Sequence, residues 1–246
     1  MKEEVKMKAL WNQIKFQKDL YLTGVLVMLG MYVFGNVLHD VLAVSDDEVT
    51  SVICMGSMMA TIALYMMMFF FAGIHMVQIF NYAVAMGQTR KRTFPMYTLA
   101  TLLTFLVLGA FLKVLNILEK LRLKLMFPGI KIENFMALVL SWKYILAFAL
   151  VGTAFAMLLG ASISRFGKAA FWVWWALLMI ICIGGPRGFT YLTDFYPDSQ
   201  ATSFVVHVIE MTVQHAHAIS AVLVIAATII FTGVAYLIVR RQQVNV

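Results

Sequence analysis

The side chains whose types and spacing best suit chemistry lie near the C-terminus. His207, Glu210, Gln214 and His217 recur at intervals of three and four residues, so a continuous helix would carry all four on one face. Three interpretations stay open for this stripe. It is a solvated patch near a membrane interface, a polar surface facing a substrate path or partner subunit, or a metal or haem site. A metal or haem site would need a further imidazole, such as that of His39.

Other catalytic and nucleotide-binding patterns are absent from the sequence. The segment "SISRFGKA" (162–169) has Ser162 where a phosphate-binding loop begins with glycine, and Ala169 where the Mg²⁺-binding hydroxyl would stand. The chain also has no G-x-S-x-G elbow and no H-E-x-x-H pair. Cys54 and Cys182 lie in apolar runs without metal-ligand spacing, which favours inert packing residues. We therefore expect no enzyme activity, metal or cofactor on this chain.

The composition indicates an integral membrane protein. Of the 246 residues, 62% are hydrophobic and 13% are charged, and the mean hydropathy is +0.87. A spanning helix needs roughly 20 mainly apolar residues. The apolar runs of the sequence predict an all-α fold in which residues 1–246 form one transmembrane domain. Its six spans are expected near 20–42, 50–76, 96–116, 138–161, 170–184 and 216–239.

The distribution of Lys and Arg predicts the orientation. With both termini in the cytoplasm, most of the 19 Lys and Arg residues fall on the cytoplasmic side, as the positive-inside rule requires. The exception is the segment "EKLRLKLMFPGIKIE" (119–133), which carries four cations on the outer side. Its alternation of Leu with Lys and Arg predicts a segment that lies along the outer headgroups.

Two shorter elements are expected beside the spans. The basic N-terminal segment 1–19 precedes an uncleaved first span, and its apolar residues repeat with helical spacing, which predicts a helix in the inner interface. The residues of this helix are Met7, Leu10, Trp11, Ile14 and Lys15. The apolar run 201–239 is too long for one span. It therefore predicts a short outer or re-entrant helix near 200–213 before the last span.

The stretch "FNYAVAMGQTRKRTFP" (80–95) separates the second and third predicted spans. Ile79–Met86 can continue a helix below the second span, Gly87 can end that helix, and Pro95 can open the third span. The result would be a short cytoplasmic helix with a cationic end. A solvated positive-inside anchor is the plainer interpretation, but Phe80, Tyr82 and Met86 would be poorly placed in water without a lipid or protein contact.

This stretch resembles the first cytoplasmic loop of small bacterial ABC-2-type permeases, the transmembrane subunits of ABC transporters. "SRFGKAAFWVWW" (164–175) is similar to their second cytoplasmic loop. The basic segment before the first span resembles their elbow helix. The six-span plan with an elaborated last outer loop also fits this family.

The resemblance implies a partner and a set of contacts. In such permeases the first loop forms a coupling helix that docks on a separate ATPase, here through Asn81, Tyr82, Met86, Gly87, Gln88, Thr89, Arg90, Lys91, Arg92 and Phe94. A secondary contact would involve Arg165, Phe166, Gly167 and Lys168. Two ATPase subunits would carry ATP and Mg²⁺, and a second permease, identical or homologous, would complete the assembly in lipid, without nucleic acid.

The resemblance also implies a location and a substrate class. The small size is similar to that of permeases in the bacterial plasma membrane that export antimicrobial peptides or protect their producers from lantibiotics. Two rivals stay open. One is a membrane haem or redox protein using His39, His207, His215 or His217. The other is a non-catalytic accessory or sensor subunit that binds a cytoplasmic protein through the basic loop.

Overall fold

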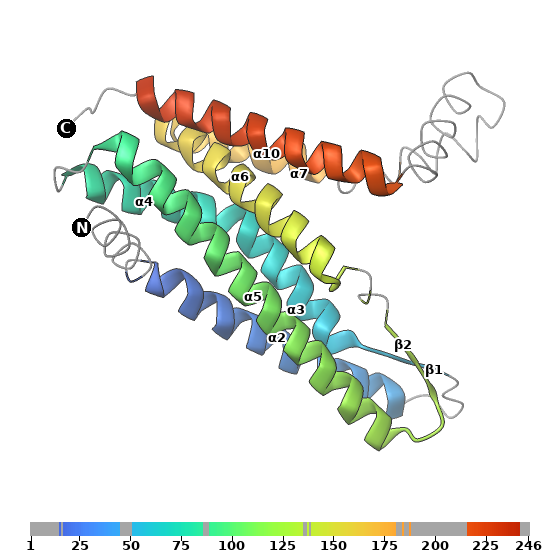
Figure 1. The fold of residues 1–246 in the computed structure, drawn as a ribbon. Coiled ribbons are helices and arrows are strands. Elements are labelled where there is room, and N and C mark those ends of the chain that lie inside the picture. The colour runs from blue at the N-terminus through green and yellow to red at the C-terminus, as the bar shows by residue number, and fades with distance from the viewer. Residues whose placement is uncertain are drawn as a thin grey trace, which may run out of the picture.

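A computed structural model shows a bundle of long helices with one short pair of strands (Figure 1). The structure describes residues 15, 17–44, 51–85, 89–134, 137, 139–180, 184, 187 and 216–241. Among these residues, five helices are long and apolar enough to cross a membrane: Lys18–Leu42, Met55–Ala83, Lys91–Met126, Trp142–Phe166 and Ala221–Arg240. The membrane-protein class follows from these lengths and compositions, because a helix satisfies its own backbone hydrogen bonds in lipid.

The predicted span at 170–184, the fifth of the six, is not confirmed. Residues 170–184 were expected to cross the membrane, but the helix described there, α7 (Lys168–Met179), has 12 residues. The rest of the predicted span includes residues 181–183, which lie outside the described residues. The predicted helix near 200–213 and most of the interfacial helix at 1–19 lie outside the described residues.

The first two spans are α2 (Lys18–Val44) and a composite helix. The composite helix consists of α3 (Met55–Met66), a π-helical turn at Met67–Phe71, and α4 (Ala72–Ala85). The π turn adds one residue per turn, so it shifts the faces of α4 relative to those of α3. Residues that share one face of α3 are therefore not in helical register with those on the same side of α4.

The third span, α5 (Arg90–Met126), differs most from expectation. It is one helix of 37 residues, whereas the sequence predicted a span at 96–116 followed by a separate outer segment at 119–133. Residues 119–126 continue the helix because Glu119 and Leu123, both almost fully buried, keep packing against the bundle. Pro95 lies inside α5 and does not open it.

A short parallel sheet departs from the expected all-α fold. Strand β1 (Ser51–Ile53) pairs with β2 (Lys131–Glu133), with Val52 opposite Ile132. Strands of three residues carry too weak an alternation to be predicted. The sheet ties the α2–α3 connection to the α5–α6 connection.

The helix α6 (Trp142–Phe166) is the centre of the bundle, with 67% of its most apolar stretch buried. It contacts α4, α5, α7 and α10 (Ala216–Arg241). The helices α4 and α6 approach closely at two glycines. A Cβ on Gly160 would lie 2.8 Å from the carbonyl oxygen of Gly73, and one on Gly73 would lie 2.7 Å from Leu159. Small residues permit such contact between membrane helices.

The turn between α6 and α7 is tighter than predicted. The two helices are separated by Gly167 alone, at φ 68°, where a segment of several residues between 161 and 170 was expected. A positive φ favours glycine. We call the end of the bundle that holds Gly167 and the α4–α5 connection the turn end, and the end that holds β1 and β2 the strand end (Figure 1).

Candidate functional site

The facing ends of α4 and α5 at the turn end, which we call the hairpin, have an exposed rim. Phe80 and Phe94, on either side of it, are each 4% exposed, and the Phe94 ring lies 5.7 Å from that of Tyr236 on α10. By contrast, Asn81, Tyr82, Lys91 and Arg92 are exposed. Aromatic anchors thus fix the hairpin while its polar side chains face outward.

The expected coupling helix, in which Ile79–Met86 continues a helix below the second span, corresponds to the last turns of α4 as far as Ala85. The helix α4 runs to Ala85 and α5 begins at Arg90. Thr89 begins α5, and its carbonyl oxygen accepts bonds from the backbone N–H groups of Arg92 and Thr93 at 3.0 Å each. Met86, Gly87, Gln88 and the side chain of Arg90 lie outside the described residues.

The predicted secondary contact also lies at the turn end. Arg165, Phe166 and Lys168 are exposed around Gly167, and the Arg165 guanidinium lies 5.3 Å from the centre of the Phe166 ring. Lys15 of the predicted interfacial helix is exposed, while Met7, Leu10, Trp11 and Ile14 lie outside the described residues.

The histidine stripe of the sequence analysis falls largely outside the described residues. His207, Glu210, Gln214 and His215 are not described, and His217 is placed only as a backbone position in the first turn of α10. His39 is buried, with Nδ1 3.2 Å from Asp40 Oδ1 and its ring 5.9 Å from that of Phe127. Within the described part of the chain, no three His, Cys, Asp or Glu side chains are placed to hold a metal ion.

The strand end contains a buried polar cluster that the sequence analysis missed. The Glu119 carboxylate, 1% exposed, accepts bonds of 2.7 Å from the backbone N–H groups of Gly56 and Ser57. Asn116 Nδ2 donates to Ser57 Oγ at 2.8 Å. Glu119 therefore caps the first turn of α3, whose own N-cap residue, Cys54, makes no capping bond.

A second contact joins the same end of α5 to α2. The Arg122 guanidinium donates to both oxygens of Asp40, at 2.8 and 3.1 Å. This two-bond geometry is the strongest that Arg and a carboxylate can form. We call Asp40, Ser57, Asn116, Glu119 and Arg122 the polar clamp. Asn116, Glu119 and Arg122 recur every three residues, a helical signal that could have placed them on one helix with the third span.

A smaller polar network lies toward the turn end, beside the π turn. Gln17, fully buried, donates from Nε2 to Thr101 Oγ1 at 3.1 Å and accepts from Thr104 Oγ1 at 3.3 Å. The Tyr97 hydroxyl donates to the carbonyl oxygen of Ala72 at 3.3 Å and lies 3.1 Å from His75 Nδ1. His75 was also missed by the sequence analysis. This network holds the composite helix by side-chain hydrogen bonds next to its π turn. Such turns often mark functional or moving parts of helices.

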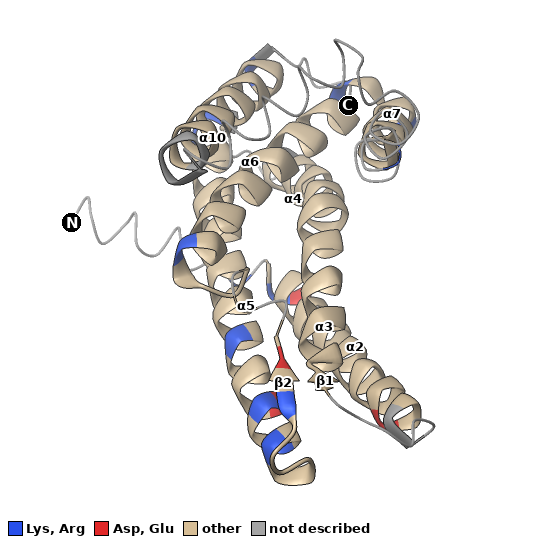
Figure 2. Ribbon diagram, turned by 90° about the vertical axis from the view of Figure 1, so that its right-hand side faces the viewer, with Lys and Arg blue, Asp and Glu red and all other residues tan. Residues whose placement is uncertain are grey.

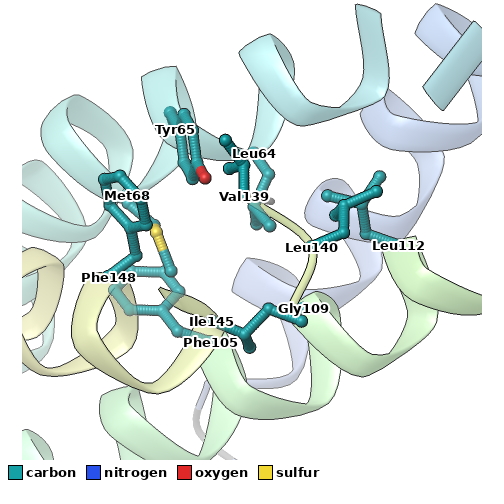
Figure 3. Close-up of a pocket in the computed structure, with 10 residues that line it drawn as sticks. All are labelled: Leu64, Tyr65, Met68, Phe105, Gly109, Leu112, Val139, Leu140, Ile145 and Phe148. Carbon is teal, nitrogen blue, oxygen red and sulfur yellow. The ribbon is translucent and has the colours of Figure 1, made fainter. Parts of the chain in front are cut away.

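An apolar pocket lies between α3, α5 and α6 (Figure 3). Its walls include Leu64, Tyr65, Met68, Phe105 and Ile145, and its volume is about 10 Å³. This is roughly the space that one water molecule requires. The pocket is therefore a packing gap between spans and is too small for a substrate.

No protein-family model, curated protein or solved structure matches this chain.

Proposed function

We propose that this chain is the transmembrane permease subunit of an ABC transporter, driven by separate ATPase subunits that dock on the turn end. The observation that carries the proposal is the α4–α5 hairpin. Its exposed Asn81, Tyr82, Lys91 and Arg92 stand on helices anchored by the buried Phe80 and Phe94. A force applied to such a hairpin moves the attached helices as rigid bodies.

The length of α5 supports the same proposal. A single helix of 37 residues extends about 55 Å, and it runs from the proposed docking surface past the polar clamp. Because the clamp holds α2 and the start of α3, a displacement of the turn end of α5 is transmitted to these two helices at the strand end. Exposed Arg165 and Lys168 beside Gly167 would form the secondary ATPase contact.

The remaining features of the proposal come from the sequence resemblance. The turn end faces the cytoplasm of a bacterium, and ATP and Mg²⁺ are bound by two ATPase subunits. The exported compound is a peptide or another amphipathic molecule with antimicrobial activity. A second permease pairs with this chain in the plasma membrane, where exposed apolar residues of α7 and α10, such as Trp172 and Ile229, contact lipid or that second permease.

Photo-crosslinking from the hairpin tests the docking surface. A photoreactive amino acid replaces Tyr82 or Asn81 in cells that make the full chain, and mass spectrometry identifies the crosslinked protein. We expect an ATP-binding cassette subunit that copurifies and hydrolyses ATP. We also expect Lys91→Glu with Arg92→Glu to reduce the copurified ATPase activity at least about tenfold, because docked charge pairs make large contributions at such surfaces.

The matched control carries the same charge change at the strand end, as Lys131→Glu with Lys143→Glu, and should keep the ATPase bound. Both pairs are exposed, so neither should disturb folding, which size-exclusion profiles would verify. A crosslinked partner without a nucleotide-binding domain, or equal ATPase recovery from both double variants, would reject the proposed function.

A further inference from the structure

The strand end of α5 carries a stripe of three lysines. Lys113, Lys120 and Lys124 lie at positions i, i+7 and i+11, which places them within roughly 40° of each other around the helix. Lys124 is exposed, and Lys113 and Lys120 are partly exposed. No described acidic side chain lies within ion-pair distance of any of them. Figure 2 shows Lys and Arg gathered along this part of α5.

A band of exposed apolar side chains runs beside the lysine stripe. Ile117, Leu121 and Leu125 are 50, 55 and 83% exposed, and they occupy the neighbouring face of the same turns. Apolar side chains this exposed are stabilised by hydrocarbon and not by water. The helix end is therefore amphipathic, with an apolar face for acyl chains and a cationic edge for headgroups.

The position of Lys113 relates this surface to the membrane interface. Its Nζ lies 4.5 Å from the centre of the Trp142 ring, at the start of α6. Trp side chains are enriched where hydrocarbon meets the headgroups, and a lysine over an indole ring gains a cation–π attraction. From Lys113, the stripe extends about 16 Å along α5 to Lys124.

We propose that Lys113, Lys120 and Lys124 bind the phosphate headgroups of anionic phospholipids in the leaflet at the strand end. Three ammonium groups in a row, none with an acidic partner among the described residues, attract anionic lipid over zwitterionic lipid. The adjoining Ile117, Leu121 and Leu125 favour a phosphate attached to acyl chains over free phosphate or an acidic protein. This binding is independent of the proposed ATPase-driven function.

Fluorescence of Trp142 measures the lipid beside the stripe. In a variant with Trp11, Trp172, Trp174 and Trp175 replaced by Phe, quenching by brominated phosphatidylglycerol is compared with quenching by brominated phosphatidylcholine in mixed vesicles. We expect phosphatidylglycerol to be enriched around Trp142 at least about threefold. Lys113→Gln, Lys120→Gln and Lys124→Gln together should remove this enrichment, and raised salt should weaken it.

A second probe guards against misfolding of the Trp-depleted variant. A fluorophore on Leu121→Cys in a Cys182→Ser chain keeps all five Trp residues and reports the same lipid contact. The matched control is a chain in which Trp172, at the turn end, is the one Trp that remains. The three Lys→Gln substitutions should leave the quenching of Trp172 by the two lipids unchanged.

Three results would overturn the proposal. They are equal quenching by the two lipids in the parent, enrichment that survives the triple substitution, and enrichment abolished by millimolar inorganic phosphate. Equal quenching by the two lipids would indicate that the lysines contact solvent or an acidic protein partner. The last would assign them to free phosphate.

Discussion

Glu119 on α5 accepts a hydrogen bond of 2.7 Å from the backbone N–H of Ser57, the third residue of α3. The first N–H groups of any helix lack partners within that helix, and a carboxylate near them is favoured by the helix dipole. The partner in this protein comes from 62 residues further along the chain. The start of one span is thus stabilised by the far end of another.

Replacing Glu119 with Gln should destabilise the protein. The Gln amide can accept from one N–H of α3 but turns its own NH₂ group toward the other, which leaves a buried donor unpaired. The expected loss is about 1–3 kcal/mol, measured as a lower melting temperature in detergent. Glu133→Gln is the matched control, because Glu133 pairs with an exposed Lys131 and such surface pairs contribute little. Equal melting temperatures for the two variants would contradict the capping role.

Gly56→Ala should be harmful for a steric reason. A Cβ at this position would collide with Asn36 Nδ2 and lie 3.0 Å from Glu119 Oε1, and overpacking of this kind costs roughly 1–3 kcal/mol. Gly30→Ala on α2 meets nothing within 4 Å, so it should be neutral or slightly stabilising. Adding Asn36→Ala to the Gly56→Ala chain should restore part of the lost stability. The thermal stability of the three variants checks this, and a Gly56→Ala chain as stable as the parent would show that the contact is loose.

Tyr97→Phe should remove side-chain contacts that stabilise the π turn. The substitution removes the hydroxyl that bonds Ala72 O and contacts His75 Nδ1, at a residue only 1% exposed. We expect a loss of about 1–2 kcal/mol and faster hydrogen exchange confined to residues 67–76. Tyr144→Phe, at a half-buried tyrosine of α6, should leave that exchange unchanged. Unaltered exchange in Tyr97→Phe would mean that helix packing alone holds the turn.

Cys54 should resist thiol reagents in the folded protein. The residue is 2% exposed, and burial raises its pKa from 9.0 to about 11. Because the thiolate is the reactive form, its fraction at pH 8 falls from about one tenth to about one thousandth. In a Cys182→Ser chain, maleimide labelling should be slow at pH 8 and should rise toward pH 11 or on unfolding in detergent. Lys131→Cys provides an exposed control, and labelling of Cys54 at the rate of that control would show that the site opens readily.

The spans could be predicted where apolar runs alone determine them. The helices α2, α6 and α10 begin and end within several residues of the predicted limits, because each run is bounded by polar residues. The burial of Cys54 was likewise confirmed. The predicted end of the third span, near residue 116, was wrong because Lys120, Arg122 and Lys124 were assigned to a separate segment, although the buried Asn116, Glu119 and Leu123 repeat with helical spacing.

The polar clamp could not be predicted from sequence. Nothing near Glu119 in the chain indicates that its partners are the backbone N–H groups of Gly56 and Ser57, since that contact exists only when α3 and α5 are packed. The same holds for Tyr97 and Ala72. The exposed rim of the hairpin was easier to anticipate, because Lys91 and Arg92 are charged residues beside apolar spans. Its docking role stays a prediction.

The parallel pairing of β1 with β2 has a consequence for biogenesis. Ser51–Ile53 leave the ribosome about eighty residues before their partners at Lys131–Glu133, and the carboxylate that caps α3 is synthesised late as well. At the strand end, α2 and α3 therefore lack both a strand partner and a capping carboxylate until α5 and β2 have been synthesised. A chain halted before residue 119 would hold its apolar segments in place, yet it would remain open to proteases at the α2–α3 connection.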